Sequence, residues 1–178
     1  SALFQDNQGN IWLGTSAGLS CLKKNSDGNY QRVKLAGVPG NYAFTAITQH
    51  LDNIYFGTTQ GNLLIYNIRS KKFSNVSLVP GVVINNLFYA KNNLLYLSTA
   101  GKGLVEYNPV NHQVSQRIPD HKDLGKIYQD KWGLLWIQPE KGIIKYDPSN
   151  ATYKLFTQKK DAEAVTIDAT YQVFEDPY

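Results

Sequence analysis

The sequence of 178 residues lacks the features that mark several common classes of protein. It has no apolar run of about eighteen residues, the length that a membrane-spanning helix needs, so no membrane contact is expected for this chain. Cys21 is the only cysteine. An intramolecular disulfide is therefore excluded, and a buried, unreactive thiol is the simplest interpretation of Cys21. No window keeps apolar residues at positions i, i+3, i+4 and i+7 over three turns, so the sequence does not predict a helical domain.

The ionisable residues also lack the spacing of several kinds of site. The histidines at 50, 112 and 121 show no metal-ligand spacing such as H-x-x-x-H, and we expect no metal and no cofactor. The net charge is +4, but the lysines occur as scattered pairs rather than as a basic stripe, so nucleic acid is not an expected partner. No signal peptide is visible, and Ser1 and Ala2 are interpreted as residues left by cloning of a piece of a longer protein.

What the sequence does contain is one stretch of about twenty residues that occurs four times. The four copies are Leu3–Leu22, Ala46–Tyr66, Leu87–Tyr107 and Ile127–Tyr146. An ungapped alignment places one aromatic residue of each copy at a single position, with spacings of 43, 41 and 40 residues: Trp12, Tyr55, Tyr96 and Trp136. A fifth copy begins as VFED at Val173. Such a period indicates a repeat architecture.

Each repeat predicts four short strands joined by hairpin turns. An apolar pair is followed by a turn, an aromatic-containing run, a second turn and a third apolar run. A last extended piece completes each unit, at residues 30–35, 72–76, 113–118 and 152–156. Gly9 and Gly133 suit the first turn because glycine accepts a positive φ. The second and third units have Asp52-Asn53 and Asn92-Asn93 there, and asparagine is expected to take over the left-handed conformation.

Four antiparallel strands in about 40 to 45 residues, repeated, are typical of a β-propeller blade. We therefore predict an all-β fold, a partial propeller that occupies residues 3–178. It should contain four four-stranded antiparallel blades and the first strand of a fifth, at about 3–35, 42–77, 82–118, 124–157 and 170–175. The aromatic residue at the Trp12 position is expected to pack between blades. Residues 161–169 could form one helical turn but are predicted to be a loop.

The repeats carry a recognisable consensus. The pattern F-x-D-x-x-G-x-[IL]-W-[IL]-G-T-x-x-G-L is read directly from FQDNQGNIWLGTSAGL at 4–19, and a weaker form is YQDKWGLLWIQPEKGI at 128–143. This resembles the two-component regulator propeller repeat. The second and third units depart from it, since they lack the turn glycine and have tyrosine for tryptophan.

The resemblance implies a place and a role for the chain. Repeats of this kind fill the periplasmic sensor region of hybrid two-component sensor kinases from gut Bacteroidetes. By that resemblance this piece is periplasmic and non-catalytic, the histidine kinase lies elsewhere in the intact protein, and the signal is an oligosaccharide-type product of glycan breakdown.

Strand order also predicts where a ligand would bind. The turns between second and third strands share one rim with the connections between blades. Candidate ligand-binding side chains on this rim are Tyr42, Gln60, Lys102, His121, Glu140 and Lys141. Their amide, charged and aromatic groups suit sugar hydroxyls, but the sequence favours the simpler interpretation that they are solvated turn residues.

Two other functions stay open at this stage. One is a structural or protein-interaction scaffold, for which open blade faces predict self-association or packing against further blades. The other is a carbohydrate-active propeller enzyme, which needs two converging carboxylates. Asp6, Asp52 and Asp130 are interpreted as caps of the same turn, and Glu140 is the only carboxylate expected on the rim, so no catalytic residue is predicted.

Overall fold

A computed structural model describes residues 1–157. In this range sixteen strands form four four-stranded antiparallel sheets and there is no helix. No helix that could cross a membrane is present among these residues either. The predicted loop at 161–169 and the predicted fifth-blade strand at 170–175 lie outside the described residues.

Each sheet is one blade, and its strands follow the chain from one edge of the sheet to the other. Blade 1 contains β1 (Ala2–Gln5), β2 (Ile11–Thr15), β3 (Gly18–Lys24) and β4 (Tyr30–Val33). Blade 2 contains β5 (Phe44–His50), β6 (Asn53–Thr58), β7 (Asn62–Asn67) and β8 (Lys72–Ser77). Blade 3 contains β9 (Val83–Tyr89), β10 (Leu95–Ala100), β11 (Leu104–Tyr107) and β12 (Val114–Gln116). Blade 4 contains β13 (Leu124–Gln129), β14 (Leu135–Pro139), β15 (Ile143–Asp147) and β16 (Thr152–Phe156).

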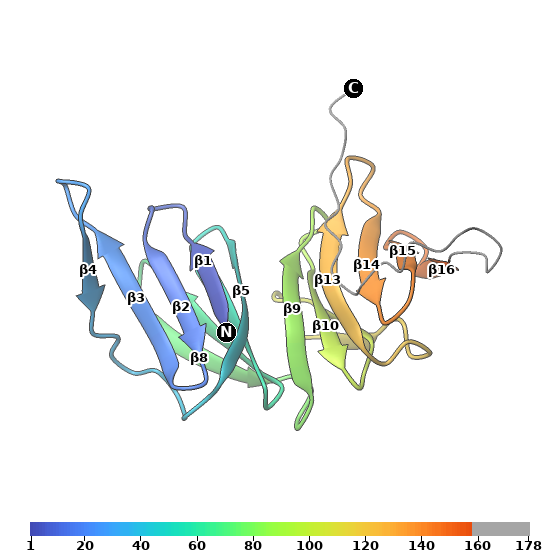
Figure 1. The fold of residues 1–178 in the computed structure, drawn as a ribbon, viewed down its shortest axis with the longest axis horizontal. Helices are drawn as coiled ribbons and strands as arrows, with labels where there is room; N and C mark the ends of the chain where they lie inside the picture. The colour runs from blue at the N-terminus through green and yellow to red at the C-terminus, as the bar shows by residue number, and fades with distance from the viewer. Residues whose placement is uncertain (158–178) are drawn as a thin grey trace, which may run out of the picture.

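The four blades lie side by side and do not close into a ring (Figure 1). Their first strands, β1, β5, β9 and β13, contact one another in sequence order along the inner side of the arc. The predicted fold class, a partial propeller of four-stranded antiparallel blades, is therefore confirmed. Ala2, interpreted as a cloning residue, lies within β1 and pairs with Gly14.

The first turn of each blade follows the prediction in three blades and departs from it in one. Gly9, Asn93 and Gly133 all have positive φ. In blade 2, however, the left-handed residue is Leu51, with φ 50°, rather than Asn53. The reason is register: His50 pairs with Asn53, so Asn53 already belongs to β6 and the turn consists of Leu51 and Asp52. The prediction for Asn53 was wrong.

The core consists of three apolar clusters, one between each pair of neighbouring blades. Trp12 is buried against Phe56 and Tyr66 of blade 2, with ring centroids 5.4 and 5.3 Å away. Tyr96 is buried in the same way against Tyr146 of blade 4, at 6.1 Å. The aligned aromatic residue thus packs on the next blade along the chain.

The other two aligned aromatic residues fit the same rule. Tyr55 is buried in the cluster between blades 2 and 3. Trp136, in the last blade that the structure describes, is only half-buried and packs beside Phe156 of its own blade. The aligned aromatic residue is therefore fully buried where the structure describes a next blade against which it packs.

Neighbouring inner strands approach so closely that side chains are restricted there. A Cβ atom on Gly14 would lie 2.6 Å from Cβ of Phe44 in the next blade, and one on Gly57 would lie 2.7 Å from Cγ2 of Ile84. The glycine of the G-T pair is therefore a packing requirement. Thr45 Oγ1 in addition donates a hydrogen bond to the carbonyl oxygen of Ile84, which links blade 2 to blade 3.

Candidate ligand-binding rim

In blades 1 to 3 the hydroxyl of a threonine at the end of the second strand holds the turn between the second and third strands. In blade 1 the Thr15 hydroxyl donates to the carbonyl of Gly18 and accepts the Ala17 N–H, at 3.2 and 3.1 Å. In blade 3 the Thr99 hydroxyl donates to the Gly103 carbonyl and accepts the Lys102 N–H, at 2.9 and 3.0 Å. These bonds fix the backbone of the rim turns and leave the turn side chains directed to solvent.

The same turns are joined to the connections that leave each blade. The Gly61 carbonyl accepts the N–H groups of both Leu78 and Val79, each at 3.1 Å. In blade 3 the carbonyl of Lys122 accepts the N–H groups of Gly101 and Gly103, at 2.9 and 2.8 Å. Turn and connection therefore form one rim, at the bottom of Figure 1.

The structure places the predicted residues of blade 3 together at this junction. Lys102 is exposed in the turn, and its carbonyl accepts a 2.8 Å hydrogen bond from Nε2 of Gln116. His121 precedes Lys122, whose carbonyl binds both sides of the Lys102 turn. The His121 ring lies edge-on to Tyr153 of blade 4, with centroids 6.0 Å apart. Lys102 and His121 are thus neighbours beside the boundary with blade 4.

The other four predicted residues are more dispersed. Gln60 is exposed in the β6–β7 turn, where its side-chain oxygen accepts a bond from the Thr59 hydroxyl. Glu140 and Lys141 are exposed in the β14–β15 turn. Tyr42 differs: its ring packs in the cluster between blades 1 and 2, and its hydroxyl accepts a 3.1 Å bond from Nδ2 of Asn75. Only the tip of this tyrosine is therefore available to the rim.

A polar group of blade 4 completes the region around His121. The Tyr153 hydroxyl donates a 2.6 Å hydrogen bond to Oδ2 of Asp120, and this bond raises the pKa of Tyr153. Ammonium, imidazole, amide and carboxylate groups thus lie along the rim of blades 2 to 4. Such a set can donate to and accept from hydroxyl groups, and it holds both signs of charge.

The carboxylates of the first turns have a structural role in two blades. Asp6 Oδ1 accepts the N–H groups of Gln8 and Asn10, and its Oδ2 accepts Nε1–H of Trp12 at 2.8 Å. Asp130 makes the equivalent bonds to its own turn and accepts Nε1–H of Trp136 at 2.8 Å. Each carboxylate therefore caps its turn and satisfies the indole of its own blade.

Asp52 does not belong to this set, so the sequence-based interpretation of it was wrong. It lies within the two-residue turn of blade 2 and forms an exposed 2.7 Å ion pair with Arg69. The residue that aligns with Asp6 in blade 2 is Gln49, six residues before Tyr55. Its side-chain oxygen accepts the backbone N–H of Asn7 in blade 1 at 2.9 Å.

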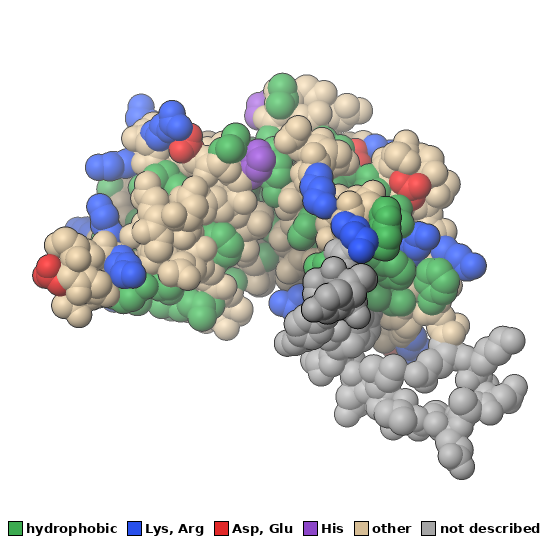
Figure 2. Space-filling view, turned by 90° about the horizontal axis from the view of Figure 1, so that it is seen from above, with side chains coloured by type: hydrophobic (Ala, Val, Ile, Leu, Met, Phe, Trp, Pro, Cys, Tyr) green, Lys and Arg blue, Asp and Glu red, His purple; other side chains and the backbone are tan. Residues whose placement is uncertain are grey.

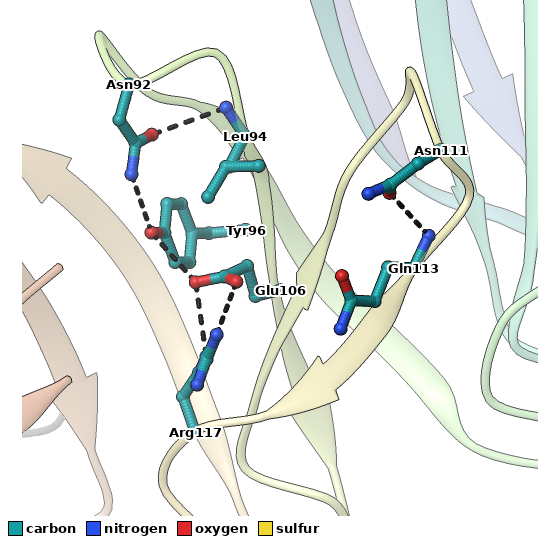
Figure 3. Close-up of polar contacts among 7 residues, drawn as sticks. All are labelled: Asn92, Leu94, Tyr96, Glu106, Asn111, Gln113 and Arg117. Carbon is teal, nitrogen blue, oxygen red and sulfur yellow. Dashed lines mark hydrogen bonds and ion pairs between the residues drawn. The ribbon is translucent and has the colours of Figure 1, made fainter.

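Blade 3 contains a polar cluster that the sequence did not indicate (Figure 3). Arg117 donates two hydrogen bonds to Glu106, with Nη2–Oε1 at 2.7 Å and Nε–Oε2 at 3.2 Å. The hydroxyl of buried Tyr96 donates to Glu106 at 3.1 Å and accepts from Asn92 at 2.9 Å. The hydrogen bond to Glu106 raises the pKa of Arg117, and burial raises the pKa of Tyr96. Two strands, a turn and the residue directly after β12 supply these groups, so no local sequence motif predicts the cluster.

The cluster is committed to packing rather than to chemistry. Both oxygens of Glu106 are paired, and they face the boundary with blade 4, where burial raises the pKa of Tyr146 to about 12. Among residues 1–157, no group of three or more His, Cys, Asp or Glu side chains is arranged to hold a metal ion.

Four-stranded blades that pack face to face along their inner strands define this molecule as a β-propeller, of which the described residues form an arc. Residues 1–17 match the family model of the two component regulator propeller. The match falls on the first repeat unit, where the consensus is read most directly. No curated protein matches the sequence.

Solved structures with a similar fold include extracellular domains of bacterial regulators. That of the hybrid two component system BT3049 from B. thetaiotaomicron has a TM-score of 0.73 and 18% identity, over 98% of this chain and 24% of that one. That of BT4673 from the same organism has a TM-score of 0.71 and 14% identity, over 90% and 24%. This chain thus spans about a quarter of the length of these structures.

An enzyme also shares the fold. Virginiamycin B lyase from Staphylococcus aureus has a TM-score of 0.68 and 13% identity, over 87% of this chain and 54% of the lyase. Identities this low establish a common fold, and function has to be argued from the residues of the chain itself.

Proposed function

We propose that this chain is the ligand-sensing propeller segment of an extracytoplasmic sensor in a hybrid two-component system, and that it is periplasmic and non-catalytic. The observation that carries the proposal is the combination of the repeat matched at residues 1–17 with four blades of the fold seen in extracellular domains of such systems. The kinase activity of the intact protein would then belong to another part of it.

The ligand we propose is an oligosaccharide bound at the rim described above. Support comes from the exposed side chains of Gln60, Lys102, Glu140 and Lys141, and from His121 beside Tyr153. The turns of Gln60 and Lys102 are held by the hydroxyls of Thr58 and Thr99. Hydroxyl-rich ligands need many donors and acceptors in a fixed arrangement, and an aromatic edge that excludes water from part of the sugar.

Calorimetric titration of the intact sensor with a panel of oligosaccharides tests this rim. Replacing Lys102, Glu140 or Lys141 by alanine should weaken the binding of the recognised sugar, by about tenfold if one charge-assisted hydrogen bond is lost. Lys71→Ala, in the turn between β7 and β8 at the other end of blade 2, is the matched control and should leave affinity unchanged. Unchanged affinity in all three rim variants would exclude this rim.

A scaffold that associates with itself or with further blades is the second candidate, and a specific face favours it. On the side of blade 1 away from blade 2, Leu3 is 72% exposed and Ile11 and Leu13 are only half-buried. Ile54 and Phe56, at the positions of Ile11 and Leu13 in blade 2, are fully buried against blade 1. An open apolar face of this kind attracts a partner surface.

Sedimentation velocity distinguishes the scaffold from an isolated sensor segment. The chain should sediment faster as its concentration rises, and Leu3→Lys combined with Leu13→Lys should suppress the association. A single monomeric species at all concentrations would count against self-association by this face. A turnover screen on polysaccharides and on streptogramins addresses the enzyme alternative, and we expect no product from either substrate class.

A further inference from the structure

The outer edge of blade 1 is built differently from the outer edges of the other blades. In blades 2 to 4 the glycine of the rim turn lies directly under a carbonyl at the end of the outer strand or just beyond it. A Cβ atom would lie 1.8 Å from the Val79 oxygen at Gly61, 2.0 Å from the Ile118 oxygen at Gly103, and 2.1 Å from the Phe156 oxygen at Gly142. At Gly18 of blade 1 no such atom lies within 4 Å.

The connection that follows β4, at residues 34–38, does not approach the Gly18 turn, and a hollow of about 370 Å³ lies between them. Its lining consists of Leu19, Arg32, Val33, Lys34, Leu35 and Val38. The connections of the next two blades bury their apolar residues at the corresponding place, Leu78 and Val79 in one and Ile118 in the other. The hollow therefore lies where the next two blades place apolar side chains of their own connections, and its lining combines apolar residues with Arg32 and Lys34.

The hollow lies beside an open strand edge. All four residues of β4 are exposed, and β4 pairs with β3 on one side. On its other side no strand of the described part of the chain is paired with it. Such an edge presents a row of backbone N–H and C=O groups that a further extended segment can pair with.

The positive charge of this edge favours an acidic segment over a basic one. Arg32 and Lys34 line the hollow, and Lys23 and Lys24 follow in the neighbouring strand opposite Gln31 and Tyr30. The nearby hairpin has one carboxylate, Asp27, whereas Asp6 is buried against Trp12. Figure 2 shows Lys and Arg side chains at the blade 1 end of the molecule, on the left, as well as over the opposite half. An acidic partner is attracted and a basic one is repelled.

We propose that the outer edge of blade 1 binds an extended acidic segment of a partner protein, which pairs with β4 as a fifth strand. One apolar side chain of the segment enters the hollow between Leu19, Val33 and Leu35. Carboxylates on either side of it face Arg32 and Lys34. This site lies at the blade 1 end of the rim, whereas Gln60, Lys102, His121, Glu140 and Lys141 belong to blades 2 to 4, and it does not depend on the identity of the sugar.

Fluorescence anisotropy with the 178-residue chain tests the proposal. The probe is a labelled peptide of alternating glutamate and valine, compared with a lysine–valine peptide and a glutamate–glycine peptide of equal length. The glutamate–valine peptide should bind at least about tenfold more tightly than either, and its binding should weaken with salt. Equal binding of the lysine–valine peptide would overturn the charge argument. Equal binding of the glutamate–glycine peptide would overturn the role of the hollow.

Two double variants locate the site. Arg32→Glu with Lys34→Glu should weaken binding of the glutamate–valine peptide by at least about tenfold. Lys71→Glu with Lys72→Glu makes the same change in charge beside β8 and should change affinity by less than about threefold. Equal losses in the two double variants would mean binding by net charge alone and would refute the site. Circular dichroism of both variants establishes that each is folded.

Backbone pairing has its own readout. Two forms of the glutamate–valine peptide, methylated at alternate backbone nitrogens, each lose half of the N–H groups. Because one of these sets faces β4 in a paired strand, one form should bind much more weakly than the other. Equal binding of both forms at the affinity of the parent peptide would exclude strand addition.

Discussion

Blades 1 and 4 carry tryptophan at the aligned aromatic position, whereas blades 2 and 3 carry tyrosine. Each tryptophan has an aspartate six residues earlier that accepts its indole N–H at 2.8 Å. The tyrosine blades have Gln49 and Ala90 in place of that aspartate. Their hydroxyl groups are satisfied elsewhere, by Asn53 for Tyr55 and by Asn92 and Glu106 for Tyr96.

The comparison shows that aspartate and tryptophan act as one unit within a repeat. An indole has one donor, and a buried donor needs an acceptor. A tyrosine hydroxyl lies further from Cα and both donates and accepts, so it reaches partners in other parts of the blade. In a blade with tyrosine there is no indole N–H for the aspartate to accept, so only its turn-capping role would be left, and other residues occur at that position.

The largest expected effect comes from removing the aromatic ring itself. Trp12→Ala should destabilise the chain by about 4 kcal/mol because it leaves a cavity against Phe56 and Tyr66. Trp136→Ala should cost about half as much, since Trp136 is half-buried. Urea denaturation of both variants measures the difference. Equal losses would mean that packing on the next blade is not what the aligned aromatic residue contributes.

Removing the aspartate should have the next largest effect. Asp6→Ala leaves the indole N–H of buried Trp12 and two turn N–H groups without their acceptor, and should cost about 2 to 3 kcal/mol. Asp52→Ala is the matched control: it removes an exposed ion pair with Arg69 and should cost less than about 0.5 kcal/mol. Similar losses would restore the interpretation that Asp52 caps an equivalent turn.

A double-mutant cycle sharpens the claim that the pair is one unit. In a Trp12→Phe background there is no indole N–H, so Asp6→Ala should lose only its turn-capping contribution. We expect a coupling free energy of about 1 kcal/mol between the two positions, obtained from four denaturation curves. Additive losses would separate the aspartate from the tryptophan.

A smaller effect is expected in the tyrosine blade that uses Glu106. Glu106→Gln keeps the shape of the side chain but removes the charge that binds Arg117 in two hydrogen bonds. Because the Glu106 and Arg117 side chains are 12% and 32% exposed, solvent screening reduces the loss, which we expect to be about 1 to 2 kcal/mol. Ile65→Val, at the corresponding position of blade 2, is a control for simple packing and should cost about 1 kcal/mol or less. An unchanged free energy of unfolding in the Glu106 variant would mean that the cluster does not stabilise the boundary between blades 3 and 4.

The same residues show how much of the fold could be predicted from the sequence. The period of the aromatic residues and the spacing of turns predicted the four-stranded blades and the burial of Trp12, because both features arise from local alternation and from repetition. The misplacement of Asp52 has a local cause: the second repeat has a shorter turn, and only pairing of His50 with Asn53 reveals its register. A strict count back from Tyr55 would have pointed to Gln49.

The repeat pattern could not predict the polar cluster of blade 3 or the hollow of blade 1, because each is a departure of one blade from the repeat. Glu106 in β11 is bound by Arg117, which directly follows β12, and nothing in their spacing distinguishes them from exposed residues of a hairpin. The hollow exists because the chain after β4 fails to close on Gly18, which depends on the path of the connection at 34–38. The six predicted rim residues lie on turns and connections, and their role in binding remains a prediction.

The smallest expected effect on stability comes from changing Tyr146, in β15 of blade 4. The hydroxyl of Tyr146 is buried without a hydrogen-bond partner in the described part of the chain, next to the cluster of Tyr96, Glu106 and Arg117. Tyr146→Phe should therefore leave stability at pH 7 unchanged or raise it by up to about 1 kcal/mol, whereas Tyr96→Phe should lower it by about 1 kcal/mol.

The same pair differs in its dependence on pH. Burial raises the pKa of Tyr146 to about 12, above its ordinary value of 10.0, so the folded state holds this proton more tightly than the unfolded chain. Its contribution to stability is present below pH 10 and is lost as the pH rises toward 12. Alkaline denaturation followed by circular dichroism should accordingly begin at higher pH in Tyr146→Phe. An unaltered alkaline transition would mean either that Tyr146 ionises as freely in the folded chain as in water, or that the boundary of blades 3 and 4 opens before the tyrosine titrates.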